Sequence, residues 1–370
     1  MVKTINTLDI RKNNRRNIIL ALHYYGPMSK QQMADTLGLS LQTVSIILKE
    51  LREEGLVDFC GVIESTGGRR AKLVALVPDA KYACGIGITK KYIYVTVVNL
   101  RSQVTFSDKS PVDFANTEEY WAAAVRLRDE ALQKSGVDKE KLLGTGISIP
   151  GIVDDEVGKV IFAPTLGEGS IDLSIMYKVF GEKIHVINDA KSAGFAYTWS
   201  KKRETKATYL LISRGIGGAI IARQTLATEA RAGEFGHLTI EKDGKLCSCG
   251  QRGCFEAYCS SGVLTSSTGL NLEEFFKALK SGNSKCREIW DEYLDYLAVG
   301  INNIRVAFDT DVVIGGEMSR YIAQYEDKLK ALLVQRNPFG DTSDYVKISD
   351  FGEYDSSIGC AHRIIDGYLS

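Results

Sequence analysis

Apolar residues recur at helical spacing three times in the N-terminal part of the chain. The first stretch predicts a helix over 14–25 that ends at a Gly-Pro pair. In the second stretch, Ser29 and Gln32 have the spacing of a capping box, which predicts a helix that ends at Gly38. Ser40 would cap a third helix, because its hydroxyl can accept from free backbone N–H groups. The inward face of that helix would consist of Val44, Ile47, Leu48 and Leu51. Two helices joined by a short turn containing glycine predict a helix-turn-helix.

Two strand-like segments, 56–59 and 72–76, follow the third helix. Between them, two glycines permit a tight tip, and Arg69-Arg70 follow at once. We interpret this segment as a wing whose arginines suit the narrow minor groove and its phosphates. Residues 1–77 are therefore predicted to form a winged helix-turn-helix that binds DNA. The third helix would present its N-terminal residues to base edges and phosphates. The residues expected to contact DNA are Ser40, Gln42, Thr43, Ser45, Lys49, Arg69 and Arg70. A small helical domain that uses a basic hairpin for protein contact is the alternative.

Beyond residue 77, buried strand patterns alternate with helical ones. Strands are expected over 92–99, 183–187 and 310–314, and a helix over 294–308. This alternation predicts an α/β body.

Length and composition agree with this division. The chain has 370 residues, of which 44% are hydrophobic and 25% charged, as in globular proteins of two or three folding units. It has no run of about eighteen apolar residues, so no membrane partner is expected. The segment from Met1 to Asp9 lacks the apolar core of a signal peptide, so we expect a cytoplasmic location.

Charge is unevenly distributed although the whole chain is neutral. Residues 1–77 carry eleven Lys and Arg against seven Asp and Glu, whereas the remainder carries thirty-five against thirty-nine. A basic end on an acidic body is typical of a nucleic-acid-binding module joined to another function.

Three of the eight cysteines, Cys247, Cys249 and Cys254, are clustered. Glycines at 250 and 253 let the chain curl so that the thiolates can converge, and zinc prefers four tetrahedral Cys and His ligands. His237 lies ten residues upstream, beyond a turn. The spacing favours a structural zinc site over a redox pair or unbound thiols. The five scattered cysteines are expected to be reduced and partly buried.

The chain resembles the ROK family (repressors, open reading frames and kinases) over nearly its whole length. The N-terminal resemblance lies in Gly38-Leu39-Ser40 through Val57 and in Gly67-Gly68-Arg69-Arg70. In the body it lies in Ile149-Pro150-Gly151-Ile152-Val153-Asp154, Ile187-Asn188-Asp189-Ala190, Gly233-Glu234-Phe235-Gly236-His237 and the run from Cys247 through Glu256. The last motif is highly specific. The resemblance implies an actin-like, two-lobed (RNase H-like) α/β fold. Its first lobe would be 78–189 with a C-terminal helix over 355–370, and its second 190–354 with the zinc site.

The resemblance also implies functional residues. Zinc would be held by His237, Cys247, Cys249 and Cys254. The sugar would be bound by Pro150, Gly151, Asn188, Asp189, Glu234, His237 and Glu256. In the kinases of the family, the aspartate at the position of Asp189 is the general base that removes the proton of the sugar hydroxyl.

The nucleotide side departs from the kinase pattern. An aspartate that organises metal and phosphates in the family is replaced here by Gly87, or by Gly85 if the register shifts by two. Arg214 replaces a small residue of a phosphate loop, and Thr165 stands where relatives often have asparagine. Phosphoryl transfer depends on positioning and charge neutralisation, so ATP and Mg²⁺ are not expected as cofactors.

We therefore expect a sugar-responsive transcriptional regulator, as a repressor of carbohydrate genes, that binds a palindromic operator as a homodimer or a dimer of dimers. An active sugar kinase with an accessory DNA-binding domain is the first alternative. A regulator with a protein effector and a vestigial sugar cleft is the second.

Overall fold

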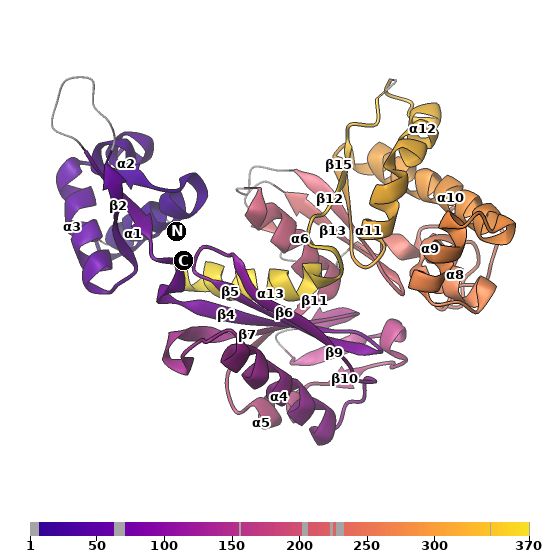
Figure 1. Cartoon of the computed structure of the whole chain (residues 1–370), viewed down its shortest axis with the longest axis horizontal. Coiled ribbons are helices and arrows are strands. Elements are labelled where there is room, and N and C mark those ends of the chain that lie inside the picture. The colour runs from indigo at the N-terminus through magenta and orange to yellow at the C-terminus, as the bar shows by residue number, and fades with distance from the viewer. Residues whose placement is uncertain are drawn as a thin grey trace, which may run out of the picture.

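The computed structural model describes residues 7–62, 71–154, 157–201, 206–222, 225–226, 233–340 and 342–369 (Figure 1). The N-terminal module has three helices, α1 Thr7–Tyr25, α2 Lys30–Leu37 and α3 Leu41–Glu53. Its antiparallel sheet has the order β1-β3-β2, with β1 Met28–Ser29, β2 Val57–Val62 and β3 Lys72–Leu76. The tip of the predicted wing, including Arg69 and Arg70, lies outside the described residues.

The predicted caps of this module are confirmed. The Ser29 hydroxyl accepts from the Gln32 N–H, and the Gln32 side chain accepts from the Ser29 N–H. Gly38 ends α2 with a φ of 64°, a left-handed conformation that glycine adopts without strain. Helix α1 begins at Thr7, seven residues before the expected start. The apolar pattern did not reveal the added segment 7–13, in which Arg11 forms an ion pair with Glu50 of α3. Within the expected range, Arg15 pairs with Glu54.

The first half of the body is built on a five-stranded sheet of order β11-β7-β4-β5-β6. Its strands are β4 Tyr82–Ile88, β5 Tyr92–Asn99, β6 Val104–Pro111, β7 Leu142–Ile149 and β11 Ile184–Asn188. Strands β4, β7 and β11 are parallel, and β5 and β6 are antiparallel additions. Helices α4 Glu118–Lys134 and α5 Ser174–Phe180 pack on one face (Figure 1). A small sheet beside it contains β8 Ile152–Asp154, β9 Lys159–Phe162 and β10 Ile171–Asp172.

The second half contains another five-stranded sheet, of order β14-β13-β12-β15-β16. Its strands are β12 Ala207–Ile212, β13 Ile216–Ala222, β14 Thr225–Leu226, β15 Asp311–Gly315 and β16 Val346–Ile348. Its helices are α7 Glu256–Cys259, α8 Ser261–Thr268, α9 Leu272–Lys280, α10 Ser284–Phe308, α11 Ser319–Ile322 and α12 Glu326–Arg336. Single 3₁₀ turns occur at Pro78–Ala80, Lys139–Lys141, Pro164–Leu166, Phe235–His237, Ala323–Tyr325 and Gly352–Tyr354.

Two helices lie side by side between the sheets, α6 Asp189–Ser200 and α13 Asp355–Leu369 (Figure 1). Helix α13 packs on β4 and β7 of the first sheet, and α6 contacts both α13 and β13 of the second sheet. The C-terminal helix thus returns to the first sheet. Among the described residues, no helix is long and apolar enough to cross a lipid bilayer.

Candidate ligand cavity, metal centre and nucleic-acid interface

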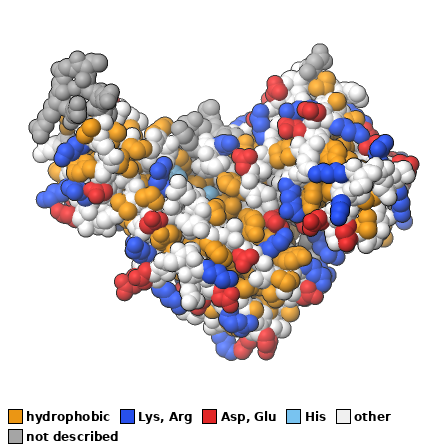
Figure 2. All heavy atoms as spheres, viewed as in Figure 1, with side chains coloured by type: hydrophobic (Ala, Val, Ile, Leu, Met, Phe, Trp, Pro, Cys, Tyr) orange, Lys and Arg blue, Asp and Glu red, His pale blue; other side chains and the backbone are white. Residues whose placement is uncertain are grey.

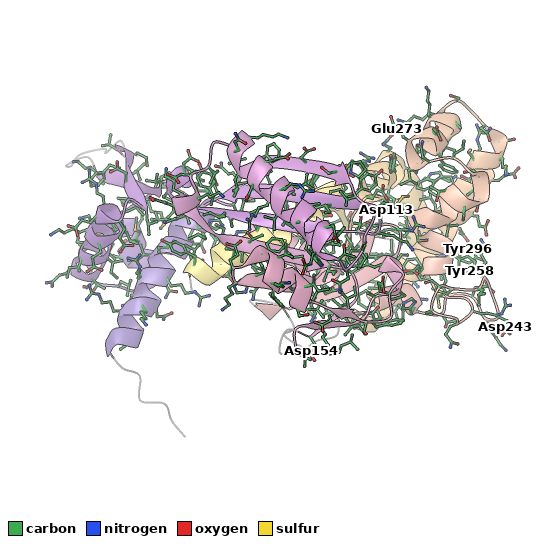
Figure 3. The ribbon with its side chains drawn as sticks, turned by 90° about the horizontal axis from the view of Figure 1, so that it is seen from below. Asp113, Asp154, Asp243, Tyr258, Glu273 and Tyr296 are labelled. Atoms are coloured by element: carbon green, nitrogen blue, oxygen red, sulfur yellow. The ribbon has the colours of Figure 1, made fainter. Side chains whose placement is uncertain are left out.

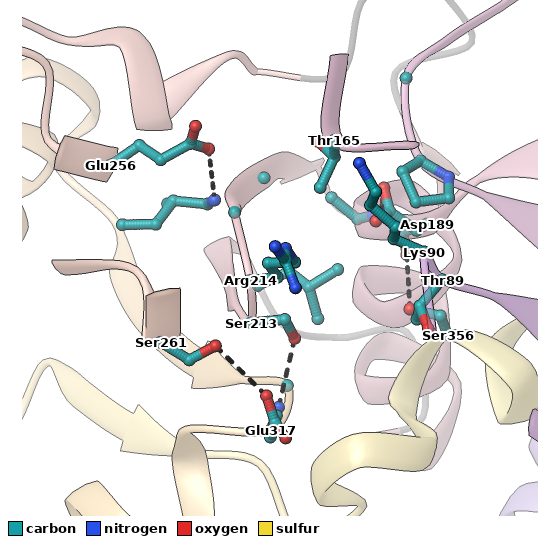
Figure 4. A pocket seen from close by; sticks show the side chains of 18 of the residues that line it. Thr89, Lys90, Thr165, Asp189, Ser213, Arg214, Glu256, Ser261, Glu317 and Ser356 are labelled. Atoms are coloured by element: carbon teal, nitrogen blue, oxygen red, sulfur yellow. Dashed lines mark hydrogen bonds between the residues drawn. The ribbon is translucent and has the colours of Figure 1, made fainter. Parts of the chain in front are cut away.

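A cavity of about 630 Å³ opens between the two sheets (Figure 4). Its wall is formed by the end of β11, the turn between β12 and β13, the start of α7 and the start of α13. All seven residues predicted to bind sugar line it, namely Pro150, Gly151, Asn188, Asp189, Glu234, His237 and Glu256. Topology explains this convergence, because the carboxyl ends of parallel strands form the crevice of an open α/β sheet.

The β11–α6 junction fixes Asp189 at the cavity wall. Asn188 caps α6 by accepting from the Lys191 N–H, and its amide donates to the Gly151 carbonyl (2.9 Å) and to Asp189 Oδ1 (3.1 Å). The Ala190 N–H also donates to Asp189 Oδ1. Burial raises the pKa of Asp189 to about 6, against the opposing effect of these hydrogen bonds, and the nearby charge of Glu234 adds to the rise.

Glu256 joins two loops that are far apart in sequence. Its Oε2 accepts from the Ile216 N–H (2.9 Å) in the β12–β13 turn, and its Oε1 accepts from the Ser248 hydroxyl (2.8 Å). Glu234 also lines the cavity, close enough for its charge to interact with that of Glu256. Burial and the charge of Glu256 raise the pKa of Glu234, and His237 opposes that rise. Carboxylates and an imidazole therefore share one side of the cavity.

The four predicted zinc ligands come together. The potential ligand atoms of His237, Cys247, Cys249 and Cys254 all lie within 4.8 Å of one another. His237 uses Nδ1 toward Cys247 Sγ (3.7 Å), and its ring lines the cavity. One imidazole nitrogen and three thiols are the donor set of a closed structural zinc site. Cys259 points elsewhere, toward the Tyr293 carbonyl, so it does not compete as a ligand.

An aromatic pair anchors the loop that carries the cysteines. The rings of Tyr258 and Tyr296 lie 4.1 Å apart, and Figure 3 shows them together, with Asp243 beyond them at the edge of the molecule. The Tyr258 hydroxyl accepts from the Lys245 N–H (2.8 Å). A side chain on Gly244 would clash with that hydroxyl, because an added Cβ would lie 2.1 Å from it. The loop is thus held at its base even before its metal ligands are considered.

Neither glycine aligned with the kinase aspartate faces the cavity. An added Cβ on Gly85 would lie 1.8 Å from the Ser357 carbonyl oxygen, and Gly87 is buried between Tyr94 and Ser357. Glycines of the β12–β13 turn also have packing roles. An added Cβ on Gly217 would lie 2.9 Å from Ala190, and one on Gly218 would overlap the ring of Phe235. These glycines are therefore explained by close packing, without a phosphate ligand.

Sequence reasoning missed two acidic residues that line the cavity, Glu317 and Glu353. The Glu317 carboxylate accepts from the Ser261 hydroxyl, and its backbone N–H donates to the Ser213 hydroxyl (Figure 4). Burial and the charge of Glu353 raise the pKa of Glu317. Glu353 pairs with Lys109 (2.6 Å) and Arg320. Arg214, which projects into the centre of the cavity, makes no ion pair with a described residue. Glu317 directly follows Gly315-Gly316, a pair that resembles the adenosine-side glycines of ROK kinases, and this resemblance was the signal available in the sequence.

Lys90 also lines the cavity from the end of β4. Its Nζ lies 2.9 Å from where a Cβ would be on Gly167. The neighbouring Thr165 faces the cavity as well, and Figure 4 shows both side chains on the same side of the opening as Asp189. Nothing in the local sequence pattern indicated a role for Lys90.

The five described residues expected to bind DNA lie on or next to α3. Gln42 and Lys49 are exposed, and Lys49 makes only a distant ion pair with Glu53 (3.8 Å). Ser40 and Thr43 bond to each other as part of the cap, and the Ser45 hydroxyl accepts from Lys30 Nζ (3.2 Å). Figure 2 shows basic and hydrophobic side chains intermixed over the surface of this module. Two hydrophobic side chains of α3 that sequence reasoning missed, Leu41 and Ile46, are also exposed.

The N-terminal module touches the body through an aromatic cluster. The ring of Trp199, at the end of α6, lies 4.9 Å from the ring of His23 and 5.7 Å from that of Tyr24. Trp199 Nε1 donates to the Ser102 hydroxyl (2.6 Å), and His362 Nε2 lies 3.3 Å from the Ser102 carbonyl oxygen. Burial lowers the pKa of His362 to about 3, so its ring is neutral at physiological pH. His362 therefore adds no charge beside this aromatic contact.

Comparison with known proteins identifies the family. The ROK family model matches residues 83–362, and a Crp-like helix-turn-helix domain model matches residues 11–66. The chain belongs to the ROK family. A xylose repressor of Caldicellulosiruptor bescii is 26% identical to it, over 100% of this chain and 98% of that protein.

Solved structures agree on the fold. A ROK family transcriptional regulator, described as a homologue of the Escherichia coli MLC protein, superposes with a TM-score of 0.75 at 19% identity, over 97% of this chain and 98% of that one. A ROK family glucokinase from Streptomyces griseus, solved with glucose and AMPPNP, superposes with a TM-score of 0.65 at 22% identity, over 76% of this chain and 98% of that one. The predicted fold, a helix-turn-helix module on an actin-like ROK body, is confirmed.

Proposed function

We propose that this ROK protein is a sugar-responsive repressor that binds operator DNA through its N-terminal module. One observation carries the proposal: a single helix, α6, starts at the cavity with Asp189 and ends at Trp199 against the helix-turn-helix module. One helix thus joins the wall of the proposed ligand cavity to the proposed DNA-binding module. The name xylose repressor, carried by a relative that spans the whole chain, supports a carbohydrate effector and makes D-xylose the first sugar to test.

The sugar would be bound by Pro150, Gly151, Asn188, Asp189, Glu234, His237 and Glu256. Ionised carboxylates accept from sugar hydroxyls, and the imidazole can bridge to one through the nitrogen that does not face the thiols. Gly151 has a φ of 109°, and an added Cβ would lie 2.3 Å from the Phe162 carbonyl oxygen, so this position requires glycine. Packing against the Phe162 carbonyl explains this glycine, and its place in the cavity wall is what supports a ligand contact.

Zinc would hold the sugar side of the cavity in place. With His237, Cys247, Cys249 and Cys254 as ligands, the metal would fix the imidazole that lines the cavity and the neighbouring Ser248 that bonds Glu256. The role of the zinc would be structural, because protein atoms would fill all four of its coordination positions.

We further propose that the cavity does not support efficient phosphoryl transfer. The described wall offers no carboxylate from β4, and Glu317 would oppose the charge of an entering phosphate. Asp189 at the end of β11 favours the alternative, a sugar kinase. ATP-dependent phosphorylation of D-xylose or D-glucose above background, abolished by Asp189→Asn, would establish that alternative.

The repressor would act as a homodimer or a dimer of dimers on a palindromic operator. Two α3 helices would enter successive major grooves about 34 Å apart, and a shift of the modules by ligand would change this spacing. The units that would move are the winged helix-turn-helix 1–77, the first lobe 78–189 with 355–370, and the second lobe 190–354.

The test is an electrophoretic shift assay on the DNA upstream of the protein's own gene. We expect specific binding that weakens steeply with salt, and an affinity that changes when D-xylose, D-glucose or N-acetylglucosamine is added. Affinity independent of a broad sugar panel would contradict the sugar response. In that case, a protein captured from lysate that alters DNA binding would identify a protein effector instead.

A further inference from the structure

Ile46 occupies the centre of the outer face of α3. Successive residues of a helix are about 100° apart, and the buried residues Val44, Ile47, Leu48 and Leu51 define the inner direction. On this count the Ile46 side chain points about 150° away from the core. It is 49% exposed and lies between Gln42, one turn before it, and Lys49, one turn after it.

About half of this apolar side chain is exposed to solvent. A single exposed apolar side chain is common on protein surfaces and by itself indicates nothing. The position of this one is what distinguishes it, because the outer face of the second helix of a helix-turn-helix faces the major groove. Leu41, the first residue of α3, is also 48% exposed, but on the same count it lies about 140° around the helix from Ile46.

Basic side chains lie along one flank of this apolar centre, and Glu53, which shares the outer face, pairs with Lys49 (3.8 Å). Lys49 lies on the same face, and Lys30 reaches α3 from α2 through its contact with Ser45. Arg52, at the end of the helix, bonds Asp58 of β2 and is 57% exposed. An apolar centre with a basic margin complements a major groove, whose floor carries base edges and whose rims carry phosphates.

We infer that Ile46 is a specificity-determining residue that contacts the C5-methyl group of a thymine in the operator. Of the four DNA bases, thymine alone presents an apolar group in the major groove. Gln42, on the preceding turn, would read the neighbouring base pair through its amide. This inference rests on the proposed DNA-binding function and adds to it one base that each half-site must contain.

The experiment begins by selecting binding sites for the full chain from a random-sequence DNA duplex library. Each thymine of the selected site is then replaced singly by deoxyuridine, which removes only the methyl group. At one thymine in each half-site, we expect the replacement to weaken binding of the wild-type protein about fourfold, from the transfer free energy of one buried methyl group.

The variant Ile46→Ala separates this contact from a general effect on DNA shape. It should bind the thymine and deoxyuridine sites about equally well, because the three outer carbons that would reach the thymine methyl group are gone. Ile161→Ala is the matched control, since Ile161 is 53% exposed on β9 of the body, and it should keep the wild-type difference.

Two results would overturn the inference while the DNA-binding function stands. One is a selected site with no deoxyuridine-sensitive thymine, and the other is equal sensitivity in the wild type and in Ile46→Ala. If the library yields no enriched site at all, the DNA-binding function fails and this inference fails with it.

Discussion

The surroundings of Asp189 act on its pKa in opposite directions. Burial at the cavity wall and the charge of Glu234 favour its neutral form, whereas the Ala190 N–H and the Asn188 amide stabilise its charge. With a pKa of about 6, the carboxyl is mainly ionised at neutral pH and can accept a hydrogen bond from a sugar hydroxyl. The carboxylate that would act as general base in a kinase can thus bind the sugar of a sensor in the same ionised form.

This raised pKa predicts a pH-dependent stability. The ordinary value is 3.8, so folding takes up a proton between about pH 4 and pH 6, and the free energy of unfolding decreases as the pH rises through that window. The decrease is at most about 3 kcal/mol, from a shift of about two units. Asp189→Asn keeps the Oδ1 atom that accepts both hydrogen bonds but cannot ionise. Its free energy of unfolding, relative to wild type, should rise between pH 4 and pH 6 and stay level above.

Urea unfolding of both proteins at several pH values measures this difference. Asp327→Asn, on the exposed start of α12, makes the same chemical change outside the cavity and should give a constant difference. A constant difference for Asp189→Asn as well would show that its carboxyl ionises normally.

At the scale of elements, the contact between α13 and the first sheet depends on glycine. In the sequence, Gly85 and Gly87 were the two positions that could align with the phosphate-organising aspartate of the family's kinases. In the fold, Gly85 instead lets the backbone of α13 approach β4, and Gly146 does the same on β7. The partner of Gly85, Ser357, is distant in sequence, and such long-range packing leaves no trace in a local pattern. By contrast, the caps of α2 and α3 are local and could be predicted from the sequence.

The two glycines of β4 should respond differently to alanine. In Gly85→Ala, the new methyl group would lie 1.8 Å from the Ser357 carbonyl oxygen, so α13 must shift. We expect a loss of about 1–3 kcal/mol or more in the free energy of unfolding, as in overpacked cores. Gly87→Ala is the control, because its nearest neighbours, Tyr94 and Ser357 side-chain carbons, lie at 3.4 Å. Equal melting temperatures for the two variants would contradict this account of the packing.

The cysteine loop gives a second prediction at this scale. Cys249→Ser should lower the zinc content measured by atomic emission below one ion per chain. It should also lower the melting temperature by about 2–4 °C for each kcal/mol of metal-binding energy lost. Cys60→Ser, at an exposed position in β2, should change neither quantity. A wild-type protein purified and loaded with zinc that retains none after dialysis would refute the metal site.

At the scale of the whole molecule, α6 connects the cavity with the helix-turn-helix module. Its ten residue steps from Asp189 to Trp199 cover about 15 Å, at 1.5 Å for each residue. Its first residue lies in the cavity wall, and its C-terminal half presents Phe195 and Trp199 as stacked rings near the module. Helix α13 runs alongside, with Ser356 lining the cavity and bonding the Asp189 carbonyl oxygen. On this arrangement, a movement of the cavity wall would reach His23 and Tyr24 through α6 and α13.

This path predicts that Trp199 is needed for the response to sugar but not for sugar binding. In Trp199→Leu, the aromatic contacts with His23 and Tyr24 are lost about 15 Å from the cavity, so sugar affinity measured by calorimetry should change by less than about twofold. The change in DNA affinity caused by sugar, typically about 5–150-fold in allosteric proteins, should fall toward one. Tyr197→Leu is the control on the same helix, because Tyr197 packs against Tyr209 of the second sheet and should leave the response intact. If Trp199→Leu responds to sugar as fully as wild type does, the signal does not pass through the end of α6, and the α13 contacts with α1 become the path to test.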